Sequence, residues 1–245
     1  MASIGLPIPN LFLASLPQED YDRLRPHLEL VDLPLRRILF EMGQPIEHCY
    51  FNDGGMTSLL IRLEDGALIE TGVVGKEGFA GLAALMGAET AAAHTSMTQM
   101  PGKGVRIKSS ILREEMLRSP ALLDRVLRYA QALNVQISQT AACNAHHELQ
   151  ERLARWLLMA HDRAEDDVLP LTQEFISMML AVRRPGVTVT ARALQNTGAI
   201  EYDRGRITVL DRARLEEASC ECYAIVRQQF QQLLGWPPSR EPGGS

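Results

Sequence analysis

The sequence predicts an α+β chain with an antiparallel β-barrel at the N-terminus, a long helix, and a winged helix–turn–helix at the C-terminus. Three observations support this order: short β-rich runs over residues 28–108, helical spacing of apolar residues over 120–144, and two short helices followed by a hairpin over 171–210. A chain of 245 residues whose texture changes in this way suits separate domains. The expected divisions are 1–118 for the barrel with an N-terminal helical segment, 119–145 for the long helix, 146–236 for the winged domain, and 237–245 for a disordered tail.

The first region consists of short β-rich runs separated by glycine and Asp-Gly turns. The clearest runs are LELVDL, RRILF, HCYFND, MTSLLIRL, ALIETGVVG and GVRIK. Short strands with a turn about every eight to twelve residues are typical of an antiparallel sandwich or barrel. The glycine-flanked segment 76–87 interrupts this pattern and predicts a short helix, at the place where a barrel would hold a ligand.

A long helix is expected next, because apolar residues over 120–144 alternate spacings of three and four. The stripe consists of Leu123, Val126, Ala130, Leu133, Ile137 and Thr140. We interpret it as the seam of a homodimer, since helix–turn–helix readers commonly bind twofold sites as dimers. The alternative is a helix packed on its own domain. Two further amphipathic helices are expected, over 147–164 and 212–234.

Residues 171–210 predict helix, turn, helix and wing. Thr172 is placed to cap the first helix, and Glu174 complements the dipole of its first turn. Pro185 suits the first turn of the second helix, and Gly198 suits its end. The sequence Asp203-Arg-Gly205 is a hairpin turn signal. A helix, a turn, a second helix and a wing is the arrangement that places one helix in the major groove of DNA.

The charge distribution favours double-stranded DNA as the partner. The whole chain carries a net charge of −5, yet residues 183–206 hold five arginines against two carboxylates, a local net charge of +3. Positive charge concentrated where this fold would meet DNA indicates phosphate and base contacts. The alternative is a DNA-independent interaction module whose arginines are only solvated.

Composition limits the other classes of protein. An apolar share of 46% is enough for real cores, and no apolar run is long enough to cross a membrane. The N-terminus lacks the pattern of a signal peptide, so we expect a cytoplasmic protein that is not attached to a membrane. No nucleophile–base pair or carboxylate constellation stands out, so we do not expect an enzyme.

The order of these parts resembles that of the Crp/Fnr family of bacterial transcription factors. The most specific similarity lies in QERLARWLLMAHDR (150–163) and LTQEFISMMLAVRRPGVTVTARALQNTGAIEYDRGRI (171–207), and it extends over about residues 10–235. The resemblance implies a sensor domain of the cyclic-nucleotide-binding jelly-roll type, a dimerisation helix, a helix at 183–194 that reads a palindrome, and RNA polymerase as a partner. The DNA contacts it implies are Thr172, Arg183, Arg184, Pro185, Thr188, Val189, Arg192, Arg204 and Arg206.

The sensor departs from the family pattern for cyclic nucleotides. Gly81 matches the family glycine, but Leu82 stands where a glutamate should hold the ribose, and residues 90–95 lack the arginine for the cyclic phosphate. His94 would supply a cation only if protonated, and burying an unpaired phosphate is costly. We therefore expect a pocket around Gly81, Leu82, His94 and Thr95 that does not bind cyclic AMP. Either it holds a less anionic ligand, or Leu82 and Ala91–Ala93 close it and no cofactor is required, which we favour.

Several alternatives concern cysteine and histidine. An iron–sulfur sensor needs a cluster of N-terminal cysteines, and the first cysteine here is Cys49. His146-His147-Glu148 suggests metal or haem, but we expect it to be junction packing. Cys220 and Cys222 are expected on one helix with their thiols turned apart, so no metal is predicted. Cys143 is a candidate for a crosslink across a twofold axis. A cyclic-nucleotide-, haem- or redox-responsive regulator, and any redox role of these thiols, stay open at this point.

Overall fold

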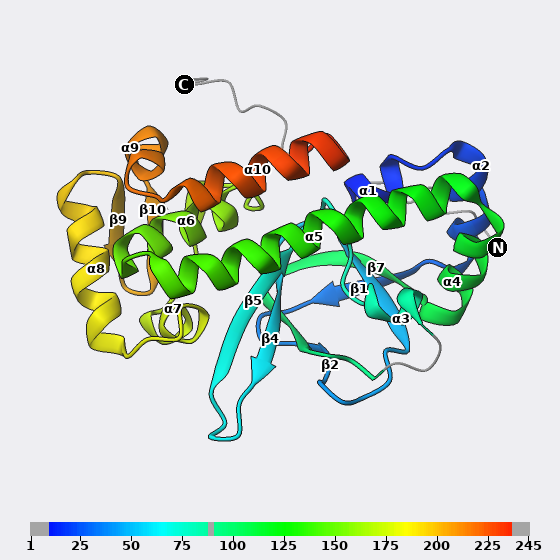
Figure 1. Cartoon of the computed structure of the whole chain (residues 1–245), viewed down its shortest axis with the longest axis horizontal. Helices are drawn as coiled ribbons and strands as arrows, with labels where there is room; N and C mark the ends of the chain where they lie inside the picture. The colour runs from blue at the N-terminus through cyan, green and yellow to red at the C-terminus, as the bar shows by residue number, and fades with distance from the viewer. Residues whose placement is uncertain (1–9, 88–90, 237–245) are drawn as a thin grey trace.

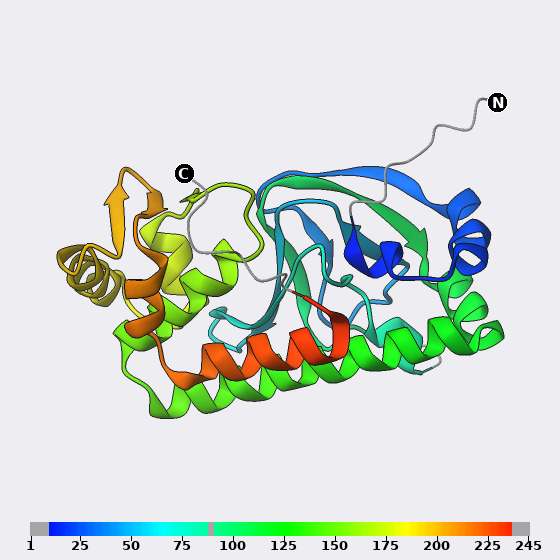
Figure 2. The same ribbon diagram turned by 90° about the horizontal axis from the view of Figure 1, so that it is seen from above.

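The computed structural model describes residues 10–87 and 91–236, so the predicted tail at 237–245 lies outside the described residues. The molecule is elongated, with the β-rich part at one end and the small helical domain at the other (Figure 1). The long helix α5 (Pro120–His146) runs beside both parts (Figures 1 and 2). Within the described residues, no helix is both long enough and apolar enough to cross a membrane.

The strands of the N-terminal part form two antiparallel sheets. One has the order β1 (Glu29–Leu33), β7 (Gly102–Lys108), β3 (His48–Asn52), and the other has the order β2 (Ile38–Phe40), β6 (Thr95–Met100), β4 (Met56–Arg62), β5 (Leu68–Val74). The pair fits the expected jelly-roll type, as a sandwich of two sheets rather than a closed barrel. Strand β6 was not among the predicted runs, because its sequence TSMTQM is largely polar although every residue in it is buried.

Short helices surround this sandwich. They are α1 (Leu11–Ala14), α2 (Gln18–Leu24), the 3-10 turn η1 (Arg25–His27), α3 (Ala83–Met86) and α4 (Ser109–Arg118). Helix α3 is shorter than the expected 76–87. An aromatic cluster ties α1 and α5 to the sheet, because Phe12 lies 5.0 Å from Phe79 and 6.0 Å from Tyr129 between ring centroids.

The predicted helix over 212–234 is in fact two helices, α9 (Arg212–Glu217) and α10 (Glu221–Leu234). Helix α10 packs along α5 in the opposite direction, as Figure 2 shows. Arg125 near the start of α5 donates to the carbonyl of Leu234 at the end of α10, at 3.1 Å. The end of α5 correspondingly lies at the start of α10.

This packing covers part of the expected dimer seam. Val126 and Leu133 are only 3% and 6% exposed and belong to a core shared with α10 and the sandwich, and Leu123, Ala130 and Ile137 pack against that core. Thr140 is also engaged within the chain, since its hydroxyl donates to the carbonyl of Gln136 and accepts from Arg155. Val126 and Leu133 are therefore buried within the chain, whereas the other four residues of the stripe are only half-buried, so the seam stays a prediction beside the alternative of a helix packed on its own domain.

The C-terminal domain is built on α6 (Leu149–His161), whose residues 153–161 are all buried. Around it lie α7 (Gln173–Met179), α8 (Arg184–Asn196), and a small sheet in the order β8 (Val168–Leu169), β10 (Arg206–Val209), β9 (Ile200–Asp203). The two-stranded wing was predicted, whereas β8 was not, because two residues carry no periodicity to detect. Helices α7 and α8 lie at the far end of the molecule from α4 (Figure 1).

Candidate nucleic-acid interface

Helix α7 begins and ends where the sequence predicted. The hydroxyl of Thr172 accepts a hydrogen bond from the backbone N–H of Phe175 at 3.2 Å, which satisfies one free donor of the first turn. After Met179 the chain turns through Ala181, whose φ of 53° is in the left-handed region. The turn is short enough to hold α7 and α8 in contact.

Helix α8 has a fully buried side and an exposed side. Val187, Ala191 and Leu194 are at most 1% exposed and pack in the core of the domain. Pro185 lies in the first turn, where its missing N–H removes no helical hydrogen bond. The buried stripe fixes which side of α8 faces outward.

The exposed side of α8 carries cationic and apolar groups together. It is formed by Arg183, Arg184, Pro185, Thr188, Val189 and Arg192, with Thr188 half-buried and the others exposed. Val189 is 70% exposed, which is unusual for a valine in a helix with an apolar core beneath it. Arg184 lies 3.3 Å from a carboxylate oxygen of Glu174 on α7, and both side chains are well exposed. An exposed pair of this kind is weak, so the guanidinium is available to a ligand.

The wing adds two more arginines beside this helix. Arg204 and Gly205 have φ angles of 44° and 80°, which form the tight two-residue turn that suits the twist of a hairpin. A Cβ on Gly205 would lie 3.3 Å from the Thr172 side chain, so the wing rests against the start of α7. Arg204 and Arg206 are both exposed. Their placement suits contact with a phosphate backbone.

The expected effector corner of the sandwich is largely packed by its own side chains. Gly81 has a φ of 108°, and a Cβ there would lie 3.2 Å from Cys49, so packing on β3 explains this glycine. Leu82 is 8% exposed and lies in the same core as Leu85. Thr95 is 1% exposed, and its hydroxyl accepts from the backbone N–H of Met42 at 3.2 Å.

His94 and the three neighbouring alanines are arranged differently from the expectation. Burial lowers the pKa of His94, and its ring lies 5.7 Å from that of Phe40. The imidazole is therefore neutral at pH 7 and provides no cation for a phosphate. Of the alanines at 91–93, only Ala92 is buried, whereas Ala91 and Ala93 are exposed, which corrects the view that all three fill the corner.

Comparison with known proteins agrees with this geometry. Residues 151–218 match the model of the Crp-like helix-turn-helix domain. No curated protein matches the sequence. Among solved structures, the chain is similar to a putative transcriptional regulator of the Crp/Fnr family from Eubacterium rectale, with a TM-score of 0.66, 18% identity, and coverage of 84% of this chain and 95% of that one. Residues 151–218 are therefore similar to the Crp-like helix-turn-helix domain, and the chain shares the fold of solved Crp/Fnr-family structures.

Two further solved structures support the same fold. FixK2 from Bradyrhizobium japonicum matches with a TM-score of 0.68 and 15% identity, covering 79% of this chain and 98% of that one. TTHB099, a transcriptional regulator of the CRP family from Thermus thermophilus, matches with a TM-score of 0.63 and 23% identity, covering 77% and 96%. The likeness extends over the sandwich, the long helix and the winged domain, and so confirms the predicted order of parts.

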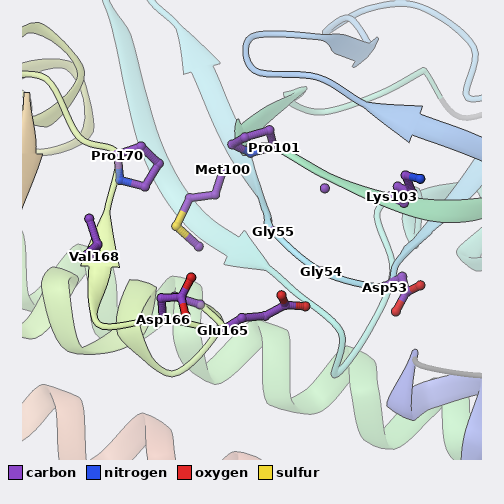
Figure 3. Close-up of a pocket in the computed structure, with 12 residues that line it drawn as sticks. Asp53, Gly54, Gly55, Met100, Pro101, Lys103, Glu165, Asp166, Val168 and Pro170 are labelled. Carbon is purple, nitrogen blue, oxygen red and sulfur yellow. The ribbon is translucent and has the colours of Figure 1, made fainter.

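An open cavity of about 490 Å³ lies where the sandwich meets the winged domain (Figure 3). Asp53 and Lys103 line it from the sandwich side, and Glu165 and Asp166 line it from the segment that leads into the winged domain. Burial raises the pKa of Asp53, and the charge of Glu165 adds to the effect. The acidic lining would repel a phosphate, so this cavity is not part of the DNA-facing surface.

The cysteines of the chain do not lie as the sequence suggested. Cys220 precedes α10 rather than lying within it, so Cys220 and Cys222 are not turned apart on one helix. Their thiols meet Cys143 and His147 at the end of α5. Sequence reasoning missed this cluster because its two halves are separated by 77 residues between Cys143 and Cys220. The only signal was the pairing of a Cys-x3-His spacing with a Cys-x-Cys spacing. Cys49 lies elsewhere, buried in the sandwich, where burial raises its pKa to about 12.

Proposed function

We propose that this protein is a homodimeric transcription regulator of the Crp/Fnr family that reads a palindromic DNA site through the exposed side of α8. The observation that carries the proposal is the contrast within that helix. Val187, Ala191 and Leu194 are buried against the domain, whereas Arg184 in the first turn and Arg192 on the outward side are exposed. In a winged helix–turn–helix, that outward side is the one that enters the major groove.

Each exposed residue of α8 has a DNA contact suited to its chemistry. Arg184 is assigned to a guanine, because its guanidinium can donate two hydrogen bonds to the O6 and N7 acceptors. Val189 makes only apolar contact and suits a thymine methyl group. Arg183, Thr188 and Arg192 flank them, while Thr172 and the wing residues 204 and 206 contact the phosphate backbone. Pro185 occupies a base-facing position without a donor, which limits direct reading there.

We place the dimer contact on a different face of α5 from the one that the sequence indicated. An exposed stripe of spacing four and three runs along α5 through Leu127, Gln131, Asn134, Ser138 and Ala141. Leu127 is 57% exposed, whereas Val126 and Leu133 of the originally expected seam are buried within the chain. Such spacing keeps one side of a helix facing a partner helix. We therefore assign the twofold contact to this stripe, with Leu127 as its apolar anchor.

The sensor domain in this proposal does not bind cyclic AMP in the usual way. Leu82 is packed into the core, the imidazole of His94 is neutral at pH 7, and Gly81 is required by its contact with Cys49. A cyclic phosphodiester there would be buried without a paired cation, which is unfavourable. We assign RNA polymerase as a partner and the cytoplasm as the location from the family alone.

Binding-site selection from random palindromic duplexes tests the proposal. The wild-type protein should enrich one twofold-symmetric sequence, and its affinity should fall steeply with salt because phosphate contacts release counterions. Arg184→Ala should lose preference at one base pair in each half-site, whereas Arg118→Ala on the distant helix α4 should not. Failure of the wild type to enrich any sequence would reject DNA reading and favour an interaction module.

A further inference from the structure

Four metal-binding side chains meet where α5 ends and α10 begins. Cys143 and His147 lie one helical turn apart at the end of α5, and Cys220 and Cys222 lie at the start of α10. The three cysteines are at most 5% exposed and form a cluster of their own, and His147 closes its outer side with its side chain 12% exposed. The antiparallel packing of the two helices brings the pairs together.

The spacing of the donor atoms fits a single tetrahedral ion. The Sγ atoms of Cys143 and Cys220 are 3.5 Å apart, and the Sγ of Cys222 lies 3.6 Å from Nδ1 of His147. All four donor atoms lie within 4.8 Å of one another. A tetrahedral Zn²⁺ with bonds of about 2.1–2.3 Å holds its ligand atoms about 3.5–3.8 Å apart. The Cys143–Cys220 and Cys222–His147 distances lie in this range, so only small side-chain adjustments are needed.

The surroundings of His147 suit a metal ligand. Its Nε2 lies 3.2 Å from a carboxylate oxygen of Glu221, so a proton on Nε2 is held there and the lone pair of Nδ1 faces the thiols. A carboxylate on the far nitrogen is the usual way in which proteins orient a histidine bound to zinc. Gln139 donates from its side-chain amide to the Sγ of Cys222 at 3.1 Å, which supports that sulfur from the other side.

The local charge also fits three thiolates and one imidazole around a divalent cation. That set carries a net charge of about −1, since three thiolates outweigh a divalent ion by one. The guanidinium of Arg155 is nearly fully buried, hydrogen-bonds to Thr140 at 2.7 Å, and acts electrostatically on Cys143. A buried arginine needs a compensating negative charge, and the loaded site would provide it.

We propose that Cys143, His147, Cys220 and Cys222 bind one structural Zn²⁺ ion. Thiolate and imidazole donors in a closed tetrahedral set select Zn²⁺ over Mg²⁺ or Ca²⁺, which prefer oxygen. The site is separate from the DNA-facing side of α8 and from the sandwich. It lies where the chain enters the winged domain after α5 and where it leaves that domain before α10. The ion therefore holds together the two segments that join the winged domain to α5 and α10, and so fixes the orientation of α8 relative to the long helix.

Metal analysis of the tag-free full-length protein, purified under reducing conditions, tests the site. The wild type should contain about one zinc per chain, and Cys220→Ser and Cys222→Ser should reduce it to less than about one tenth. Cys49→Ser is the matched control, because Cys49 is equally buried but lies in the sandwich, and it should keep its zinc. Circular dichroism of each variant establishes that it is folded.

Cobalt substitution tests the geometry in the wild type and needs no variant. After chelation, Co²⁺ should restore about one equivalent and give the intense visible bands of a tetrahedral ion together with a thiolate charge-transfer band. His147→Ala should keep the charge-transfer band but shift the visible bands. Wild-type protein without zinc and without these cobalt bands would overturn the proposal. A Cys143–Cys220 disulfide in freshly isolated, metal-free protein would likewise overturn it, in favour of a redox pair.

Discussion

Arginines in two regions of the molecule have opposite surroundings. At the junction of the sandwich and the winged domain, the side chain of Arg163 is 2% exposed and donates twice to Oε1 of Glu77, at 2.9 and 2.7 Å. Its guanidinium also lies 4.7 Å from the centroid of the Trp236 ring. On α8, the side chain of Arg184 is 64% exposed and has only the exposed Glu174 beside it.

This difference separates structural arginines from those left for a ligand. A buried guanidinium must be paired within the protein, because an unpaired buried charge is costly. An exposed guanidinium costs nothing when free, and its weak pair with Glu174 does not compete with a phosphate. The amino-acid composition does not distinguish these two kinds of arginine. The burial and pairing of Arg163 show that it supports the fold, whereas the exposed guanidinium of Arg184 is available to a ligand such as DNA.

The largest expected effect is at the buried pair. Arg163→Met leaves the carboxylate of Glu77, which is 1% exposed, without its partner, so the free energy of unfolding should fall by roughly 3–5 kcal/mol. Urea denaturation measures this. Adding Glu77→Gln to the same chain should restore a large part of the loss. A single variant as stable as the wild type would mean that the junction does not depend on this pair.

Two leucines on α5 sharpen the assignment of its faces. Leu133→Ala removes side-chain volume from the core and should cost roughly 2–5 kcal/mol of unfolding free energy. Leu127→Ala should change that free energy by at most about 0.5 kcal/mol, because the side chain is exposed, yet it should weaken self-association in sedimentation. If Leu133→Ala instead gives a stable monomer, the originally expected seam would be correct.

A buried carboxyl in the sandwich makes stability depend on pH. Burial raises the pKa of Glu70 to about 7 from an ordinary value of 4.5, and the indole N–H of Trp156 donates to it at 2.7 Å. The folded protein holds this proton more tightly than the unfolded chain. Protonated Glu70 therefore contributes its full stability below pH 4.5, and the contribution is lost as pH rises to about 7.

The matched variant for this effect is Glu70→Gln, which resembles the protonated carboxyl at every pH. The stability of the wild type relative to this variant should fall by roughly 3 kcal/mol between pH 4.5 and 7.5 and then level off. Chemical denaturation over that range measures the difference. A constant difference between the two proteins would show that folding does not shift the pKa of Glu70.

On the exposed side, Arg184→Ala should leave the melting temperature unchanged and weaken specific DNA binding by roughly 1–3 kcal/mol. Fluorescence anisotropy with the selected palindrome at fixed salt measures the loss. Arg118→Ala, which removes an equally exposed arginine from α4, should bind like the wild type. Equal losses from the two variants would indicate a general charge effect rather than a base contact.

The smallest expected effect is that of cyclic AMP, which should not shift the melting temperature at millimolar concentration. A site occupied at a hundredfold excess over its dissociation constant would add about 2.7 kcal/mol, so a null result is informative. Tight stoichiometric binding in calorimetry would show that another group pairs the phosphate in place of His94.

The winged domain could be predicted from the sequence, because the signals that specify it are local. The cap at Thr172, the proline at position 185, the turn at Arg204-Gly205 and the buried stripe of α8 each act within a few residues of chain. The same holds for most strands of the sandwich, whose runs are apolar and bounded by turn residues. Strand β6 was not predicted, because a strand of largely polar residues gives no apolar pattern and is buried only by its neighbours in the fold.

The elements that cover the long helix and the contacts among the cysteines depend on tertiary packing and could not be predicted from the sequence. A stripe of spacing three and four shows that one side of α5 is buried but not against what, and α10 with the sandwich covers it. The thiols of Cys143 and Cys220 meet because α10 returns antiparallel along α5 after a break before Glu221. Periodicity describes one helix at a time, whereas these contacts depend on how two distant helices pack.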